Sequence, residues 1–419
     1  MRQERCVSHM HVAGYRCTLC KTEFSYTEDM MTCPHCGETG ILDIVFDYEA
    51  IKKELTRETL LKDRTNSMWR YLPLLPVEGH HWERFLRVGW TPLYRSNRLG
   101  NELGLKALYI KDDGLNPTAS LKDRASAVAV ARAKELGFET IACSSTGNAA
   151  SSLAGNAARM GLKSVIFVPS RAPKGKVAQL LIFGANVVSV QGDYRDTFEL
   201  SRAAIDKWGF YNRNAGINPI MTEGKKTVSL EIAEQLLFLP TDWVAVSVGD
   251  GCTVGGVYNG FKDLYELGII DRIPKILGVQ SSGCCPFVNA AKSGAQLEPT
   301  PENTLADSIA VGVPRNPEKA LRAVRESNGA WVAVDDAQIL DAMRLLGRTE
   351  GVFGEPAGVT ATAGVKQAVA EGIIGANESV TVICTGSGLK DVANAMQAAG
   401  EPFSCPPDIK ELEKSGRIQ

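Results

Sequence analysis

From about residue 108 to the end of the chain, short apolar runs alternate with longer segments in which apolar residues recur every three or four positions. The apolar runs predict strands at residues 108–111, 140–143, 164–168, 186–190, 243–248, 275–279, 330–334 and 380–384. The segments between them predict helices, the clearest at residues 121–136, 149–160, 174–183, 194–208 and 225–237. Strands that alternate with helices indicate an α/β fold with a mostly parallel sheet covered on both faces. In such folds ligands bind beyond the carboxyl ends of the strands, so the loops that follow the strands are the candidate binding sites.

Residues 1–45 lie outside this alternation and contain two closely spaced cysteine pairs. The pairs are Cys17-Thr-Leu-Cys20 and Cys33-Pro-His-Cys36, and twelve residues separate them. Each pair offers two thiolates to one tetrahedral ion, and the intervening stretch can fold back as a hairpin that brings the pairs together. This spacing predicts a small zinc ribbon with Cys17, Cys20, Cys33 and Cys36 as ligands; the alternative is a ribbon that has lost its metal. Its small core is expected from three aromatic residues, Tyr15, Phe24 and Tyr26.

Composition narrows the functional classes. With 419 residues, 44% hydrophobic and 22% charged, the chain has the material for two or three globular domains. The net charge of −2 gives no electrostatic case for nucleic acid or an anionic membrane, and no apolar run approaches the roughly 18 residues that a membrane span needs. Apart from the N-terminal cluster the eleven cysteines are scattered, which suits a reducing cytoplasm. All five histidines lie at or before His81, so the α/β region supplies no catalytic histidine.

The stretch at residues 115–124 reads Leu-Asn-Pro-Thr-Ala-Ser-Leu-Lys-Asp-Arg and places a lysine at an unusual position. Asn116-Pro117 predicts a turn, and Ser120 is a candidate cap for the helix that follows. Lys122 then lies in the first turn, where free backbone N–H groups and the positive end of the helix dipole disfavour a cation. Either its side chain points into solvent, or its pKa is lowered and the amine is a nucleophile that forms a Schiff base with a carbonyl cofactor.

Three polar loops that follow predicted strands favour the second alternative. Residues 145–148, Ser-Thr-Gly-Asn, lead into a helix whose N-terminus suits an anion. Residues 249–253, Gly-Asp-Gly-Cys-Thr, follow an apolar strand, and their glycines allow consecutive amides to surround a phosphate; their spacing differs from the dinucleotide-binding pattern. Residues 385–391 begin with Thr385, whose hydroxyl can bond a neutral ring nitrogen. A reactive lysine, a phosphate cradle and this hydroxyl together predict a pyridoxal phosphate site.

These motifs resemble those of the threonine synthases. Residues 116–124 are similar to the family's lysine motif, Asn-Pro-Thr-Gly-Ser-Phe-Lys-Asp-Arg, and residues 145–148 resemble its Ser-Thr-Gly-Asn loop. Further family motifs recur in the same order at Asn218-Pro219, Glu223-Gly224, Lys226-Thr227, Glu355-Pro356-Ala357 and residues 385–391. The resemblance covers roughly residues 85–395 and implies a pyridoxal phosphate enzyme of fold type II, with two doubly wound, mostly parallel sheet domains. The catalytic region is then residues 46–419, with a smaller mobile subdomain at about residues 125–225. It also implies a homodimer that acts on a small-molecule amino-acid substrate.

The resemblance also implies roles for individual residues. Lys122 forms the Schiff base with pyridoxal phosphate and shuttles protons, and Asn148 contacts the ring hydroxyl. The cofactor phosphate lies against Gly249, Asp250, Gly251, Cys252 and Thr253, and Thr385 faces the pyridine nitrogen. The substrate carboxylate is held by Ser145, Thr146 and Asn148. A neutral hydroxyl opposite the nitrogen gives a weaker electron sink than a carboxylate partner, and such sites favour elimination and replacement at the β- or γ-carbon over transamination.

The chain departs from the family pattern where the substrate is recognised. Threonine synthases convert O-phosphohomoserine and water into threonine and phosphate, and the arginine that commonly serves the substrate phosphate is here Met221. Lys225 is a candidate to compensate, as are Ser144 and Lys111. The expected function is that of a threonine synthase-like carbon–oxygen lyase. The missing arginine keeps open a second interpretation, elimination or β-replacement on an unphosphorylated or differently activated amino acid, as in serine/threonine deaminases or β-substituted alanine synthases. A third interpretation is a non-catalytic binding protein.

Overall fold

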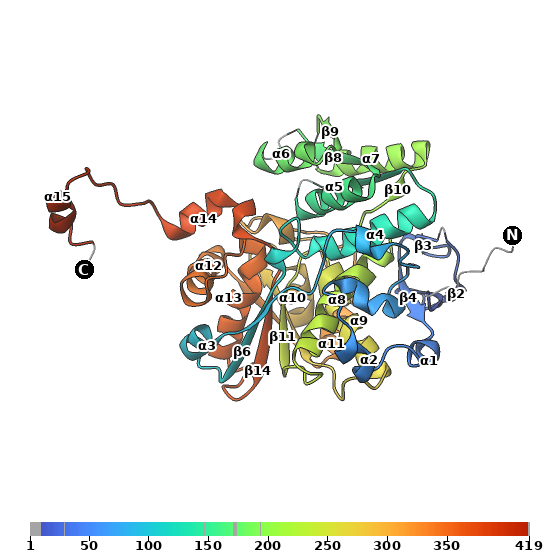
Figure 1. Cartoon of the computed structure of the whole chain (residues 1–419), viewed down its shortest axis with the longest axis horizontal. Helices are drawn as coiled ribbons and strands as arrows, with labels where there is room; N and C mark the ends of the chain where they lie inside the picture. Colours follow the sequence, from blue (N-terminus) through green and yellow to red (C-terminus); the bar gives the residue numbers. More distant parts are fainter. Residues whose placement is uncertain (1–9, 29, 146, 171–173, 193, 418–419) are drawn as a thin grey trace.

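The computed structural model describes residues 10–28, 30–145, 147–170, 174–192 and 194–417, and it has three parts. A small antiparallel sheet lies at the N-terminal end, a four-stranded sheet with its helices lies at the top of Figure 1, and a six-stranded sheet forms the larger body below. Both larger sheets are built from strands that alternate with helices, so the expected α/β class with two mostly parallel sheets is confirmed.

The N-terminal sheet has the strand order β2-β1-β4-β3. Its strands are β1 (Val12–Cys17), β2 (Glu23–Ser25), β3 (Thr32–Cys33) and β4 (Gly37–Phe46). Tyr15 is buried with Leu42, and Phe24 and Tyr26 pack against them, as the aromatic pattern predicted. Ion pairs from Asp43 to Lys319 and Arg322 attach this sheet to the larger body.

The connecting segment up to the first long helix contains short elements that cover the larger body. They are α1 (Tyr48–Ile51), α2 (Arg57–Lys62), α3 (Asn97–Leu103) and the 3-10 helices η1 (Met68–Leu74), η2 (Trp82–Arg84) and η3 (Asp113–Leu115).

The four-stranded sheet is parallel throughout and has the order β10-β7-β8-β9. Its strands are β7 (Thr140–Ser144), β8 (Lys163–Pro169), β9 (Asn186–Val190) and the two-residue β10 (Tyr211–Asn212). Its helices are α4 (Lys122–Glu135), α5 (Asn148–Met160), α6 (Lys174–Ile182) and α7 (Tyr194–Trp208). β10 is too short to give a sequence signal; it forms because Tyr211 and Asn212 pair with Ile141 and Ala142.

The six-stranded sheet has the order β13-β12-β11-β14-β6-β5, and only the edge strand β5 is antiparallel to its neighbour. Its strands are β5 (Leu93–Arg95), β6 (Ala107–Asp112), β11 (Trp243–Ser247), β12 (Lys275–Ser281), β13 (Ala330–Val334) and β14 (Ser379–Cys384). The helix α13 (Pro356–Ala370) packs on one face, and α9 (Cys252–Glu266) and α11 (Pro317–Glu326) pack on the other.

The remaining helices complete these layers. They are α8 (Ile220–Gln235), α10 (Pro286–Ser293), α12 (Asp336–Glu350), α14 (Val392–Ala399), α15 (Ile409–Lys414) and the 3-10 helices η4 (Asp307–Ile309) and η5 (Gly388–Lys390). The buried helix α4 contacts α5 on one side and α8 on the other, so it joins the two larger sheets.

Two local predictions were wrong. The helix expected at residues 225–237 runs from Ile220 to Gln235 instead. Pro219 precedes it, and proline suits the start of a helix because its φ is already helical and the N–H groups there have no partner within the helix. Ser120 does not cap α4: the residue before the helix is Leu121, and the Ser120 backbone forms a bridge with Gly386 instead.

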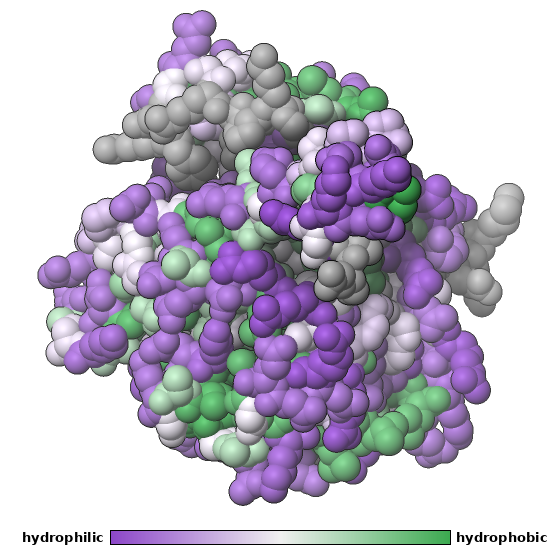
Figure 2. Space-filling model, turned by 90° about the vertical axis from the view of Figure 1, so that its left-hand side faces the viewer, coloured by the Kyte–Doolittle hydropathy of each residue, from purple (hydrophilic) through white to green (hydrophobic). Residues whose placement is uncertain are grey.

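No helix in the described part of the chain is both long and apolar enough to cross a membrane. The face that carries the C-terminal segment is mostly hydrophilic, and its apolar residues appear in separate small patches (Figure 2).

Candidate active site

The loop that carries Lys122 follows β6 and is fixed by the loop that follows the neighbouring strand β14. The amide of Leu121 donates to the carbonyl of Thr385 at 2.9 Å, and the amide of Ser387 donates to the carbonyl of Ala119 at 3.0 Å. Ala119 adopts φ 66° to make this turn, at the position where the threonine synthase motif has glycine. A left-handed alanine costs roughly 1–2 kcal/mol. The pairing brings Lys122 and Thr385, which lie far apart in the sequence, to one edge of the sheet.

Lys122 is the first residue of α4 and is half-buried. Burial lowers its pKa, and the nearby positive charge of Lys225 lowers it further, to about 8. The Glu355 carboxylate opposes this shift, and Arg213 adds to it. Of the two alternatives for this lysine, its half-buried position and lowered pKa favour a reactive amine over a side chain that merely points into solvent.

A buried network of charges anchors α4 just after this lysine. Arg124 donates to Asp113 through Nε at 2.7 Å and to Glu231 through Nη1 at 2.6 Å. Lys111 donates to Glu231 at 2.7 Å, and all four side chains are 0% exposed. Because Lys111 is consumed by this ion pair, it cannot replace the missing arginine of the substrate site.

Asn148, the first residue of α5, is buried and faces Glu355 at the start of α13. The Asn148 side-chain amide donates to Glu355 Oε1 at 2.5 Å, and the Glu355 backbone amide donates to the carbonyl of Gly386 at 3.0 Å. A Cβ on Gly386 would lie 2.2 Å from Glu355 Oε1, so any larger residue there would force the Glu355 side chain to shift. These contacts tie the loop after β7 to the loop after β14. Glu355 was part of a recognised motif, but the sequence analysis did not assign it to the site.

The glycine loop after β11 turns sharply into α9. Gly251 has φ 92° and precedes the first helical residue, Cys252, without a side-chain cap on the helix. A Cβ on Gly249 would lie 2.8 Å from the Cα of Ile309, so the loop packs closely against η4. The Asp250 carboxylate accepts from the amide of Arg315 at 2.8 Å and from the Asn316 side chain at 2.6 Å. Asp250 therefore fixes the loop through its side chain, and only its backbone is available for a phosphate.

Cys252 and Lys225 lie on facing helices beside this loop. The Cys252 thiol is 3.5 Å from the hydroxyl of Thr222, one turn before Lys225 on α8. Lys225 is buried and makes no hydrogen bond or ion pair within the described ranges. Thr253 is half-buried in the first turn of α9.

In the loop before α5, the Ser145 side chain is hydrogen-bonded within the loop itself. The Ser145 hydroxyl accepts from the amide of Gly147 at 3.2 Å, and Thr146 lies outside the described residues. The N-cap of α5, Gly147, provides no side-chain cap, and a Cβ on it would meet only Ser308 Oγ, at 3.8 Å. Ser144 is buried and neutral, so it supplies no charge to replace the missing arginine.

The residues fit pyridoxal phosphate. Lys122 provides an amine with a lowered pKa. The N-terminus of α9 has no side-chain cap, so its backbone amides are available, and Gly251 before it packs too closely against Asn316 to carry a side chain. The hydroxyl of the buried Thr385 makes no hydrogen bond to any residue that the structure describes, so it remains available to a ring nitrogen.

Glu355 gives the site a pH-dependent group, which leads to a testable prediction. Burial and the charge of Asp307 raise its pKa to about 7, whereas an unfolded glutamate titrates near 4.3. The folded state therefore binds more protons between these values, so this contribution to stability is present below about pH 4.3 and is lost as the pH rises to about 7. We expect the free energy of unfolding of the wild type to fall across this window, relative to Glu355→Gln, by on the order of 3 kcal/mol.

Denaturant unfolding at a series of pH values measures this difference. Glutamine keeps an oxygen for Asn148, and Glu371→Gln at the exposed end of α13 is the matched control. Parallel pH profiles for wild type and Glu355→Gln would contradict the assignment of a protonated Glu355.

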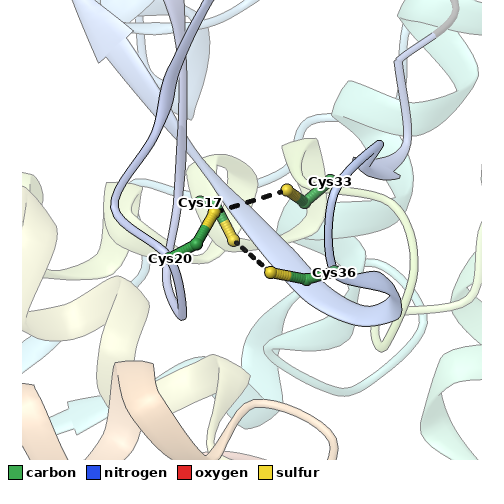
Figure 3. Close-up of side chains that lie close together, drawn as sticks. All are labelled: Cys17, Cys20, Cys33 and Cys36. Carbon is green, nitrogen blue, oxygen red and sulfur yellow. Dashed lines mark hydrogen bonds between the residues drawn. The ribbon is translucent and has the colours of Figure 1, made fainter.

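The four N-terminal cysteines form a second cluster, away from Lys122 in the sequence. Their sulfur atoms all lie within 4.8 Å of one another. Cys17 and Cys36 are 3.9 Å apart, and Cys20 and Cys33 are 3.7 Å apart. Zinc at its usual bond length to sulfur holds tetrahedral ligands about 3.8 Å apart. Figure 3 shows the four side chains converging from the ends of β1 and β3 and the turns that follow them.

Comparisons with known proteins show which family the chain resembles. The family model of pyridoxal-phosphate dependent enzymes matches residues 85–386. A threonine synthase of Methanocaldococcus jannaschii is 41% identical over 403 residues, 95% of this chain and 98% of that protein. A threonine synthase of Synechocystis sp. is 36% identical over 349 residues, 82% of this chain and 89% of the relative.

Solved structures share the fold. The processed form of threonine deaminase isoform 2 from Solanum lycopersicum matches 80% of this chain and 94% of its own, with a TM-score of 0.66 and 21% identity. Maize serine racemase matches 78% of this chain and 94% of its own, with a TM-score of 0.63 and 22% identity. The expected fold type II architecture is thereby confirmed. The chain belongs to the pyridoxal-phosphate dependent enzymes and, within them, to the threonine synthase family.

Proposed function

We propose that this chain converts O-phosphohomoserine and water into threonine and phosphate, using pyridoxal phosphate bound to Lys122. The observation that carries the proposal is the half-buried Lys122, whose amine has a pKa lowered to about 8, at the point where the loops after β6 and β14 are joined. Relatives of similar length that are 41% identical and named threonine synthase support the same reaction.

The cofactor would be held by residues from four loops. The backbone amides of residues 249–253 would receive its phosphate, the Thr385 hydroxyl its ring nitrogen, and the Asn148 side chain its ring hydroxyl. Bound pyridoxal phosphate supplies an electron sink that labilises bonds around the α-carbon of an amino acid. Thr385 carries no charge, so it would leave the ring nitrogen unprotonated, a state that favours elimination and replacement.

Side chains of the chain itself would position the substrate and move protons. Lys122, with its pKa lowered to about 8, can both accept and release a proton near neutral pH. Glu355 orients the Asn148 amide through its 2.5 Å hydrogen bond. Ser145, Thr146 and Asn148 at the N-terminus of α5 would hold the substrate carboxylate, where backbone amides favour an anion. Lys225 adds a buried positive charge close enough to Lys122 to lower its pKa.

One incubation tests the reaction. The cofactor-loaded protein with O-phosphohomoserine should release threonine and inorganic phosphate in equal amounts. Parallel incubations with serine and with threonine should yield no 2-oxo acids. Formation of 2-oxo acids without threonine synthesis would overturn the proposal.

A second candidate function is elimination or β-replacement on an unphosphorylated or differently activated amino acid. Met221 favours it, because the position that commonly carries the phosphate-binding arginine is 0% exposed and packed among apolar residues. The serine and threonine incubations decide between the two functions.

We also propose that Cys17, Cys20, Cys33 and Cys36 bind one structural zinc ion. The sulfur spacing supports this, and all four positions are occupied by protein ligands, which is typical of a structural rather than a catalytic site. A Cys17→Ser/Cys33→Ser variant should lose its zinc, falling from one equivalent per chain to none, and should keep the cofactor absorption band.

Metal analysis and absorption spectra of the same preparation provide this test. Cys143→Ser/Cys405→Ser removes two cysteines outside the cluster and serves as the control. Unchanged zinc in the first variant would refute the ligand assignment. Simultaneous loss of zinc and cofactor would show that the metal supports the catalytic region as well.

Three further features of the proposal remain open to test. We propose that the chain forms a homodimer, that the region at about residues 125–225 moves as a smaller subdomain during the reaction, and that the protein works in a reducing cytoplasm. The ten described cysteines are free thiols, which supports the last of these.

A further inference from the structure

Arg213 is a buried cation that the sequence motifs did not identify. It directly follows β10, and its backbone amide donates to the carbonyl of Ala142 at 3.0 Å. Its side chain is almost fully buried, at 2% exposed. Nε and Nη2 donate to the hydroxyl of Ser126 at 3.2 and 3.1 Å. Nη1 makes no hydrogen bond within the described ranges, and the guanidinium has no ion pair there.

The contacts of Ser126 place this guanidinium beneath the active site. Ser126 lies one turn after Lys122 on α4, and Ser152 lies one turn after Asn148 on α5, so each pair shares a helix face. The two serine hydroxyls are 2.7 Å apart. The Arg213 guanidinium therefore lies where α4 and α5 contact each other, one helical turn further along these helices than Lys122 and Asn148. Its charge is close enough to contribute to the lowered pKa of Lys122.

Arg213 and Lys225 are buried cations without a carboxylate partner in the described part of the chain, and of the two only Arg213 has a planar guanidinium. Other buried cations are paired: Arg70 with Glu234, Lys111 with Glu231, Arg124 with Asp113 and Lys226 with Asp263, at 2.5 to 2.7 Å. Asp123 is close enough to affect the pKa of Arg213, but its oxygens accept from Thr118 and Asn156. A buried charge without a partner is unfavourable unless an anion binds to it.

We propose that Arg213 binds the phosphate of a phosphorylated amino-acid substrate, an inference that rests on the proposed function. The reaction involves three anionic groups, and the site offers three places for them. The cofactor phosphate has the amides at the start of α9, the substrate carboxylate has those at the start of α5, and the substrate phosphate has Arg213. The free Nη1 group suits phosphate, because guanidinium groups form charge-assisted hydrogen bonds to phosphate oxygens. Arg213 thus takes the role that Met221 cannot fill.

The experiment compares O-phosphohomoserine with homoserine, which lacks only the phosphate. Both are titrated into the cofactor-loaded enzyme, and the change in the cofactor absorption band gives apparent dissociation constants. In Arg213→Gln the constant for O-phosphohomoserine should rise by roughly 10- to 100-fold, and that for homoserine should stay within about twofold. Arg213→Lys, which keeps the charge without the planar fork, should fall between wild type and Arg213→Gln.

Arg132→Gln is the matched control. Arg132 is a buried arginine on α4, but it lies ten residues beyond Lys122, about 15 Å along the helix. Its variant should keep the wild-type preference for O-phosphohomoserine over homoserine. If Arg213→Gln does not fold, wild-type enzyme provides the test: inorganic phosphate should compete with O-phosphohomoserine for binding and should not compete with homoserine.

The possible outcomes are distinct. Equal losses for both ligands in Arg213→Gln, or no loss for either, would refute the role of Arg213. In the wild-type competition, a failure of phosphate to displace O-phosphohomoserine would refute it as well. A third outcome separates the two proposals. If the wild type binds O-phosphohomoserine more tightly than homoserine, Arg213→Gln loses this preference and the wild type makes no threonine, then Arg213 binds the phosphate but the proposed reaction is wrong.

Discussion

Lys122→Ala should lose the absorption band of lysine-bound pyridoxal phosphate and should lower threonine formation by about 10²- to 10⁴-fold. The first effect follows because no other amine occupies the first turn of α4, and the second because a proton-transfer group of suitable pKa contributes about that factor to a rate. The pKa of about 8 for Lys122 means that a substantial fraction of the amine is neutral near pH 7.5. Absorption spectra of the dialysed protein and initial rates with O-phosphohomoserine measure the two effects.

Lys134→Ala is the control for this variant, because Lys134 lies on the same helix and is exposed. It should keep both the absorption band and the rate. An unchanged spectrum in Lys122→Ala would show that another lysine carries the cofactor, and the assignment of the site would then fail.

Arg124→Met should destabilise the protein by about 3–5 kcal/mol. The substitution leaves Asp113 and Glu231 buried with only Lys111 to balance them, and an uncompensated buried charge has a cost of this size. Although burial raises the pKa of Glu231, the charges of Arg124 and Lys111 hold it at about 2. Glu231 therefore contributes stability above about pH 4.3, and that stability is lost as the pH falls to about 2. The difference in the free energy of unfolding between wild type and Arg124→Met should therefore become smaller as the pH falls over this range.

Denaturant unfolding from pH 7 to pH 3 measures this difference. Arg348→Met provides the comparison, because Arg348 pairs with Glu102 at 3.2 Å on the surface, where the two side chains are 64% and 45% exposed. The comparison variant should change the free energy of unfolding by less than about 1 kcal/mol. If both variants destabilise the protein to the same small extent, the buried network does not anchor the lysine loop.

Several parts of the molecule could be predicted because their signals are local. The strands and helices from residue 108 onward follow from the hydrophobic periodicity, which is a property of each segment alone. The cysteine pairs predict convergence of the four sulfurs, because each pair forms a tight loop and twelve residues allow the chain to turn back between them. Lys122 was recognised because a lysine at a helix start is unfavourable unless it has a use.

The remaining features depend on contacts between distant segments. Ser120 carries the local signal of a helix cap, but its backbone pairs with Gly386, so the tertiary contact overrides the local preference. β10 has two residues and forms only because β7 offers a free edge beside it. The resemblance places Asp250 at the cofactor phosphate, and only the folded chain shows that its carboxylate binds the segment at Arg315 and Asn316, which leaves its backbone for that role.

The sequence alone predicts a pyridoxal phosphate site, because a lysine, a glycine loop and a hydroxyl each follow a strand, and parallel strands bring their carboxyl ends to one edge. The tertiary structure decided which charges remain for the substrate. Nothing in the sequence around Lys111, Lys225 or Arg213 shows which of them has a carboxylate partner in the folded chain. Only the folded chain pairs Lys111 with Glu231 and leaves Arg213 without a carboxylate under Lys122. Charge pairing depends on the distances between segments that are far apart in the chain, and these distances cannot be read from the sequence.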